Sequence, residues 1–423
     1  MTHFNFLKIS IFLFIASITF HQVVVLEIIS NITIRISEIS FLILIMFLTI
    51  NILKKKISIY YSKLDYILLL FIFLSFIHII LFPNKSTLIG SIIFIYSYLI
   101  YLIFKTYFQN FGLKFIENIL IACAVFAGFT SILGWVLIQL GINTNLVLTY
   151  DYPISIGEQG RSRGLFETPN SLFFFLVWPA LIVFQRLKDN YSILNIIIFL
   201  IIFFGCFFTF SKSNVILISL IIIFLSKHLI NKGLKKILNL FSIFLIIVYF
   251  FLSHFLILDK KSKSFEKYTT KWFVSETYQP ILEFKNYVVI PTNYIETKKK
   301  NLELFYKNPF LGNGFNSYTN FASEKVPHEM GKPHSTYFGY LSEFGILGLF
   351  ILLISFSYIL RTTWKERKKY YFLYLFALFI LIEAFNSDLM TSRIIWIFFA
   401  YTEYISINNF TNRNEAKKIH LFR

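Results

Sequence analysis

The sequence predicts an all-α integral membrane protein with about twelve transmembrane helices and one large extracytoplasmic loop. Of its 423 residues, 57% are hydrophobic and 20% are aromatic, and the mean hydropathy is +0.68. A soluble domain of this length cannot bury so much apolar surface. Apolar runs also recur along the whole chain, and most approach the length of about 20 helical residues that crosses a hydrocarbon core.

The expected spans follow one another along the chain, with short polar gaps between all but two of them. The first run lacks a small-residue cleavage signature after its apolar core, so we interpret it as a retained span and not as a signal peptide. Residues 1–423 are therefore expected to form a single polytopic membrane domain. The spans are expected at residues 6–28, 37–53, 65–82, 87–104, 115–141, 169–185, 192–210, 214–226, 238–257, 334–360, 371–387 and 393–408.

The distribution of basic residues predicts that both termini are cytoplasmic, because Lys and Arg in short loops stay on the inner side of a membrane. With this orientation, more than half of the 40 Lys and Arg residues lie in the inner loops and tails. Most of the net charge of +18 is then expected to face anionic membrane lipids, and no nucleic-acid partner is needed to explain it. The short outer loops hold only Arg35, Lys85, Arg161, Arg163, Lys212 and Arg393.

The long gap at residues 258–333 predicts a large outer loop with an amphipathic helix embedded in it. In the stretch TNYIETKKKNLELFYKNPFLGNGFNSY, apolar residues recur at helical spacing, and the Pro and Gly residues of NPFLGNG end the helix. At about 100° per residue, Lys298 and Lys299 are expected on the apolar stripe, whereas Lys300 points away. The two inward lysines either reach lipid headgroups along apolar surface or bind an anion.

Basic residues stand at the outer-face starts of four expected spans. The sixth span has Thr168 as its expected N-cap and Pro169 in its first turn. A helix N-terminus prefers anions, so cations at four such positions suggest a bound anion that compensates both the helix dipoles and the side chains. A lipid diphosphate fits this place; the alternative is that each cation contacts phospholipid headgroups. The basic residues are Arg161, Arg163, Lys212, Lys332 and Arg393.

His334 opens the tenth span, in the stretch KPHSTYFGYLSEFGILGLF. The nearby cations and the positive end of the helix favour neutral imidazole relative to an ordinary pKa of about 6.5. A neutral imidazole can take a proton from a sugar hydroxyl that attacks a carbon carrying a diphosphate leaving group. His21 and His78, by contrast, are expected inside spans with only hydrogen-bonding roles, and Gly345 offers the tenth span a close-packing surface.

Four segments, in this order, resemble the signature segments of the bacterial O-antigen polymerase and O-antigen ligase superfamily. They are RSRGLFETPNSL, FTFSKSN, KNPFLGNGFNSY and HSTYFGYLSEFGILGLF, and they fall within about residues 160–350. The resemblance implies a GT-C-like membrane glycosyltransferase that uses an undecaprenyl diphosphate-linked glycan as donor, without a metal or other cofactor. It also implies the bacterial inner membrane, with the large loop in the periplasm.

The resemblance further implies roles for individual residues. The family histidine at the position of His334 assists acceptor activation, and basic residues at several matching positions grip the diphosphate. The family usually has Arg at the position of Lys212 and in the loop helix, and a lysine supplies a point charge in place of a bidentate fork. The candidate substrate-binding residues are Arg161, Arg163, Asn170, Lys212, Lys298 and Lys299.

The acceptor and even the class of function stay open at the level of sequence. A polymerase transfers the glycan to another lipid-linked repeat unit, whereas a ligase transfers it to lipid A core. Richness in Lys, Ile, Asn and Phe is usual for polymerases encoded in AT-rich polysaccharide clusters, so we favour a polymerase, with a chain-length regulator as a further candidate partner. A flippase or transporter predicts ionisable residues near the midplane of several spans, whereas here the charges cluster at the outer ends, with Glu383 inside the eleventh span as an exception.

The sequence shows no pattern that favours a metal site. Cys123 and Cys206 both lie within expected spans and form no zinc spacing. Metal-dependent transferases acting on lipid-linked glycans need paired carboxylates on the outer face, and the first outer loop has no adjacent acidic pair. The scattered acids Asp151, Glu158 and Asp388 remain, but we expect no metal and no other cofactor.

Overall fold

The computed structural model describes residues 3–20, 24–29, 32–54, 57, 61–149, 160–227, 229–261, 280–319, 321 and 333–421. Most of these residues are helical, and within these ranges seven helices are long and apolar enough to cross a membrane. They are α2 (Ile36–Leu53), α3 (Lys63–Leu81), α4 (Lys85–Phe111), α5 (Lys114–Gln139), α6 (Pro169–Asp189), α9 (Lys232–His254) and α13 (Thr336–Glu366). A polytopic helical membrane protein is therefore confirmed, whereas the number of twelve spans and the GT-C-like fold stay predictions.

Five further helices coincide wholly or in part with the remaining expected spans. They are α1 (His3–Thr19), α7 (Ile193–Phe207), α8 (Asn214–Lys227), α14 (Tyr371–Glu383) and α15 (Arg393–Leu421). The first expected span is wrong in its second half, because α1 ends at Thr19 and the chain then forms the antiparallel strands β1 (Val24–Ile29) and β2 (Ile32–Arg35). The β-branched valines and isoleucines of this stretch suit a strand as well as they suit a membrane helix.

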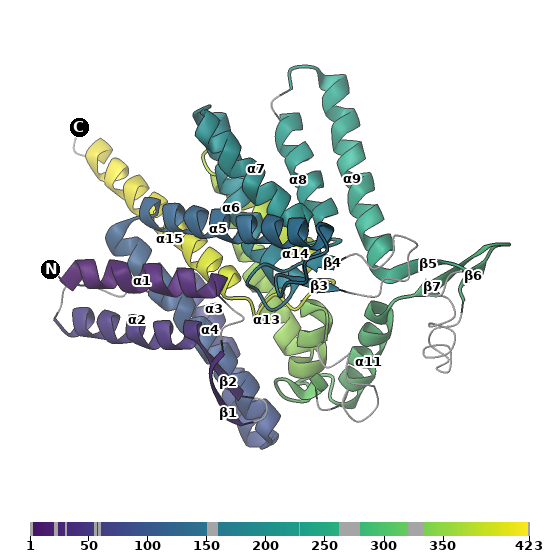
Figure 1. Ribbon diagram of the computed structural model, residues 1–423. Helices are drawn as coiled ribbons and strands as arrows, with labels where there is room; N and C mark the ends of the chain where they lie inside the picture. Colours follow the sequence, from purple (N-terminus) through teal and green to yellow (C-terminus); the bar gives the residue numbers. More distant parts are fainter. Residues whose placement is uncertain are drawn as a thin grey trace.

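Aromatic side chains fill the centre of the helical body. Trp178 of α6 stacks on Phe376 of α14, with ring centroids 5.8 Å apart, and meets Phe398 of α15 edge-on at 5.6 Å. Figure 1 shows α8 and α9 side by side as a helical hairpin, and most of the apolar surface of α9 stays exposed. An exposed apolar helix face is the surface expected to contact lipid.

The region between α9 and α13 forms a small sheet and a helix. Strands β5 (Phe255–Asp259), β7 (Tyr287–Pro291) and β6 (Leu282–Glu283) pair antiparallel in that order, and Figure 1 shows them projecting away from the helices. Strand β5 follows α9 directly, and β7 leads into α11 (Asn293–Lys307), the helix in the stretch where an amphipathic helix was expected. The paired strands thus return the chain from the end of α9 to the start of α11.

The loop after α11 inserts its backbone into a break in α13. At Gly345 the helix is interrupted by a left-handed backbone conformation with φ 67°. The amide of Ile346 there donates to the carbonyl of Pro309, at 2.9 Å. A Cβ atom at Gly345 would lie 2.3 Å from the carbonyl oxygen of Phe310, so only glycine fits. The expected close packing at Gly345 is confirmed, but the partner is the NPFLGNG turn and not another helix.

Candidate functional site

The ends of five helices meet at a group of polar side chains. The group lies where α9 and α14 end and where α8, α11 and α13 begin. At its centre is the ring of Tyr294 in the first turn of α11: the Nζ of Lys212 lies 5.8 Å from its centroid, and the ring of His334 lies 5.5 Å away, edge-on. We call Lys212, His254, Tyr294, Lys298 and His334 the lysine cluster.

Lys298 is held by two neutral acceptors. Its ammonium contacts Nε2 of His254, and it donates to Oδ1 of Asn386 at 2.9 Å. Within the described ranges, no carboxylate lies within ion-pair distance of Lys298 or of Lys212. Within this part of the chain, neither positive charge is neutralised by a carboxylate of the protein.

Burial lowers the pKa of both of these lysines. Loss of solvent lowers the pKa of Lys298 to about 8. The pKa of Lys212 is also lowered to about 8, by burial first and then by the positive charge of Arg161. Both ammonium groups are charged at neutral pH but poorly hydrated, which favours the approach of a negatively charged ligand.

The orientation expected for the neighbouring lysines of α11 is wrong. Lys299 is exposed, although it was expected on the inward stripe. Lys300, expected to point away, is largely buried and pairs with Glu296 one turn earlier, at 3.1 Å. The face of α11 that packs against the protein is therefore displaced by about one residue from the expected face. Of the two lysines that were expected to point inward, only Lys298 reaches the lysine cluster.

Arg161 extends the cluster toward α6 and α7. It lies in strand β4 (Gly160–Ser162), which pairs with β3 (Val147–Thr149). Its Nε donates to the carbonyl of Thr209 at 2.7 Å, and its Nη2 donates to Oδ1 of Asn170 at 2.8 Å. Asn170, one residue past Pro169 at the start of α6, therefore orients this arginine. Thr168 caps α6 by accepting the amide of Ser171, as expected.

Arg163 points to a different part of the structure. Its Nε donates to the carbonyl of Asn145 at 2.8 Å, and its Nη1 donates to the carbonyl of Glu167 at 3.3 Å. Asn145 belongs to the loop between α5 and β3, away from the residues of the lysine cluster. Arg161 thus lies close enough to Lys212 for its positive charge to lower the pKa of that lysine, whereas Arg163 contacts this loop.

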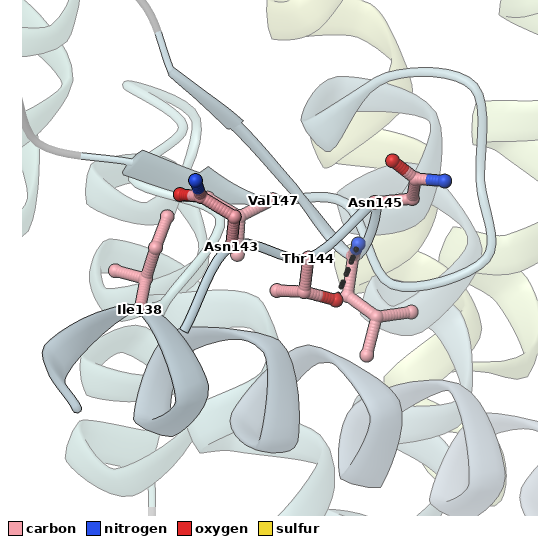
Figure 2. Close-up of a pocket in the computed structure, with 6 residues that line it drawn as sticks. Ile138, Asn143, Thr144, Asn145 and Val147 are labelled. Carbon is pink, nitrogen blue, oxygen red and sulfur yellow. Dashed lines mark hydrogen bonds between the residues drawn. The ribbon is translucent and has the colours of Figure 1, made fainter. Parts of the chain in front are cut away.

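A cavity of about 620 Å³ opens beside that loop (Figure 2). Figure 2 shows Asn143, Thr144 and Asn145 along its wall, with the hydroxyl of Thr144 accepting the amide of Leu146 at 3.2 Å. Its six lining residues carry no charged side chain, and none of them belongs to the lysine cluster. The cavity is polar and uncharged, so a diphosphate would find no cation in it.

Not all of the helix N-termini with nearby basic residues are placed to bind the anion that the sequence suggests. At α13 the amide of Thr336 donates to the carbonyls of Ala384 and Ser387, so protein groups already satisfy it. Arg393, at the start of α15, pairs with Glu38 of α2 and donates to the hydroxyl of Tyr96. Lys332 lies outside the described residues. Only Lys212 and Arg161 among these cations join the lysine cluster.

His334 has a strained backbone directly before α13. Its φ is 46°, a left-handed conformation that residues other than glycine rarely adopt. The next residue, Ser335, is the N-cap of α13, and its hydroxyl donates to the carbonyl of Ala384 at 3.1 Å. Backbone strain of this kind persists where the surrounding structure holds it, and it is common at functional sites.

Several residues in and around the lysine cluster have no distinguishing pattern in the sequence. His254 ends α9, and Asn386 follows α14, so both meet Lys298 across long stretches of chain. Glu383, to which we assign no role from the sequence, is buried at the end of α14. Its carboxylate accepts the hydroxyls of Tyr249, at 2.7 Å, and Ser387, at 2.6 Å. Only a three-dimensional arrangement brings these side chains to the lysines.

The remaining candidates from the sequence have other surroundings. Nε2 of His78 donates to the carbonyl of Leu311, 2.7 Å away, which fits its expected hydrogen-bonding role. Cys123 and Cys206 are free and buried. Among the described residues, no group of three or more His, Cys, Asp or Glu side chains could hold a metal ion. Asp151, Glu158 and His21 lie outside the described residues.

Residues 197–353 match the family model described as O-antigen ligase. The match covers well under half of the chain, and it contains all five residues of the lysine cluster, whereas Arg161, Arg163 and Asn170 precede it. No curated protein matches the sequence. The family match confirms the resemblance to the O-antigen polymerase and ligase superfamily and supports a function of the O-antigen ligase or polymerase type.

Proposed function

We propose that this protein is a metal-independent polysaccharide polymerase. It transfers a glycan from undecaprenyl diphosphate to a sugar hydroxyl of another lipid-linked repeat unit. One observation carries the proposal: His334 and Lys212 both contact the ring of Tyr294, and Lys298 lies one turn further along the same helix, inside the region that matches the O-antigen ligase family. Neither lysine has a carboxylate partner among the described residues. A base beside a site for a dianionic leaving group is what this transfer needs.

In the proposed reaction, His334 takes the proton of the acceptor hydroxyl while the hydroxyl oxygen attacks the anomeric carbon of the donor. The new glycosidic bond forms as the bond between that carbon and the diphosphate oxygen breaks. The electron pair leaves with the undecaprenyl diphosphate, and the proton leaves through the imidazole. Two glycans are joined, and lipid diphosphate is the second product.

Lys212 and Lys298 stabilise the diphosphate as its charge grows. At an effective dielectric constant of about 20, two unit charges about 4 Å apart attract by roughly 4 kcal/mol before desolvation. Two lysines that are already desolvated in the free protein need little further dehydration to engage the phosphate oxygens. Arg161, held by Thr209 and Asn170, adds a third positive charge that attracts the diphosphate.

The proposal places the reaction at the periplasmic face of the bacterial inner membrane. Both termini are then cytoplasmic, and the loop at residues 258–333 is periplasmic, as the basic residues predict. The lipid tail of the donor lies in the membrane, and its diphosphate lies at the ends of the helices. A chain-length regulator is a further partner in this setting.

The test is glycan transfer in proteoliposomes supplied with purified polyprenyl diphosphate-linked repeat units, in the presence of EDTA and without lipid A core. A polymerase yields ladders that lengthen with time. If no product forms until lipid A core is added, the protein is a ligase that uses the same donor. If no transfer occurs with either acceptor, while donor moves between leaflets, the protein is a transporter and the proposal is wrong.

Donor affinity is expected to fall as the pH rises through about 8, because an anion binds the charged forms of Lys212 and Lys298. Above this pH, the KM for the donor should rise by about tenfold per pH unit for each lysine whose charge is required. Steady-state transfer measured from pH 6.5 to 9.5 gives this profile. Replacing both lysines with arginine should flatten it, because a guanidinium stays charged.

The stability of the ligand-free protein should change in the opposite direction. Both lysines have a folded-state pKa below the ordinary value, so between about 8 and 10.5 the unfolded chain binds more protons than the folded protein. The free energy of unfolding should therefore rise with pH in this window while the donor affinity falls. A KM that stays constant up to pH 9.5 would contradict the assignment of the two lysines.

A further inference from the structure

We infer that His254 is a positioning residue for Lys298. Its neutral imidazole accepts one N–H of the ammonium group and thereby aims another N–H at the diphosphate. This inference rests on the proposed function, and it concerns a histidine that neither the sequence pattern nor the family resemblance singles out.

The hydrogen bonds of His254 determine its tautomer. Nδ1 lies 2.7 Å from the carbonyl oxygen of Phe250, one turn earlier in α9, and a carbonyl can only accept. Nδ1 therefore carries the proton. Nε2 faces the ammonium of Lys298, which can only donate, so Nε2 is an acceptor and the ring is neutral. The same ring packs face-on against the ring of Phe250, with centroids 6.3 Å apart.

The two helices that carry this pair are fixed to one another next to it. The hydroxyl of Thr292, the N-cap of α11, donates to the carbonyl of Ser253 at 2.6 Å, and its amide donates to the carbonyl of His254 at 2.8 Å. Lys298 lies less than two helical turns from Thr292. The end of α9 therefore determines where the ammonium of Lys298 lies. The side chain of α9 that contacts this ammonium is His254.

The neutrality of the acceptors is the feature that points to a ligand. Lys300, on the same helix, is bound by the carboxylate of Glu296 at 3.1 Å, which cancels its charge. Lys298 is instead bound by an imidazole and by the amide oxygen of Asn386. These two acceptors orient the ammonium without neutralising it, and they occupy two of its three N–H groups. Among the described residues no acceptor takes the third N–H, so this N–H and the charge can serve a phosphate oxygen.

Two substitutions separate positioning from packing. In His254→Gln, the side-chain amide oxygen can take the place of the Nε2 acceptor, whereas His254→Phe keeps a ring without any acceptor. Binding of inorganic pyrophosphate to the purified full-length protein in nanodiscs, followed by calorimetry, reports on the anion site without catalysis. We expect His254→Phe to weaken binding about tenfold and His254→Gln to keep it within about threefold of the wild type. Thermal unfolding of each variant shows whether it is folded.

A double-mutant cycle with Lys298→Ala makes the test independent of general destabilisation. If His254 acts through Lys298, then His254→Phe should have almost no further effect in the Lys298→Ala background. Additive losses would overturn the inference, as would equal losses in His254→Gln and His254→Phe. If wild type binds pyrophosphate and Lys298→Ala binds it equally well, or if wild type does not bind it, the proposed diphosphate site itself is wrong.

Discussion

Replacing His334 with alanine is expected to reduce glycan transfer by a factor of about 100 to 10,000, the usual contribution of a positioned general base. The imidazole lies against Tyr294, whose ring also contacts Lys212, so its removal leaves the diphosphate site in place while the acceptor hydroxyl loses its proton acceptor. Single-turnover transfer measured in proteoliposomes with saturating donor reports directly on this step. Binding of pyrophosphate should stay within about twofold of the wild type.

The strained backbone of His334 calls for a matched control. Asparagine tolerates a positive φ better than alanine does, so His334→Asn should keep the local structure while it removes the base. We expect this variant to melt at nearly the wild-type temperature and to lose activity to the same extent as His334→Ala. If His334→Asn were folded and fully active, His334 would not be the base, and the strain would have to be explained by packing alone.

Replacing Gly345 with alanine is expected to destabilise the protein by several kcal/mol and to lower the yield of folded protein sharply. The residue needs a φ of 67° with a ψ of −165°, a backbone conformation that is essentially restricted to glycine and costs an L-residue about 1–3 kcal/mol. The added Cβ would also lie 2.3 Å from the carbonyl oxygen of Phe310 and 2.6 Å from the amide of Gly312. Both neighbours are backbone atoms, so relief requires that the whole loop moves away from α13.

Thermal unfolding and size-exclusion chromatography in detergent measure this effect, and Gly233→Ala serves as the control. Gly233 lies at the exposed start of α9, and the nearest atom to an added Cβ would be Oδ1 of Asn231, 3.3 Å away. Alanine is the better helix former, so this control should be neutral or slightly stabilising. If Gly345→Ala melted like the control, the contact between the loop and α13 would not be important for stability.

The parts of the fold that depend on local composition were predictable. Apolar runs place a helix in every expected span, and the family segments lead to the superfamily that the match over residues 197–353 supports. His334 was found because a polar residue at the start of an apolar span is conspicuous. The strands after α1 were missed because valine and isoleucine serve a membrane helix and a strand equally well, and hydropathy does not separate the two.

Contacts across distant segments were not predictable. His254 lies inside the span expected at residues 238–257, and its contact with Lys298 depends on the sheet that returns the chain from α9 to α11. The error at Lys299 has a different cause, because a helical stripe drawn at 100° per residue cannot place a boundary residue to better than about one position. The ion pair with Glu296 holds the side chain of Lys300 against the protein, so that Lys300 is buried and Lys299 is exposed.

The loop inserted at the break in α13 also determines which parts of this protein can change in evolution. The backbone of residues 309–314 exchanges hydrogen bonds with the backbone of α13 on both sides of Gly345, for example from Gly314 to the carbonyl of Glu343 at 3.0 Å. The register between α11, which carries Lys298, and α13, which follows His334, is therefore fixed by main-chain atoms. Side chains along this junction can vary without moving the base relative to the cation, provided that the glycines remain.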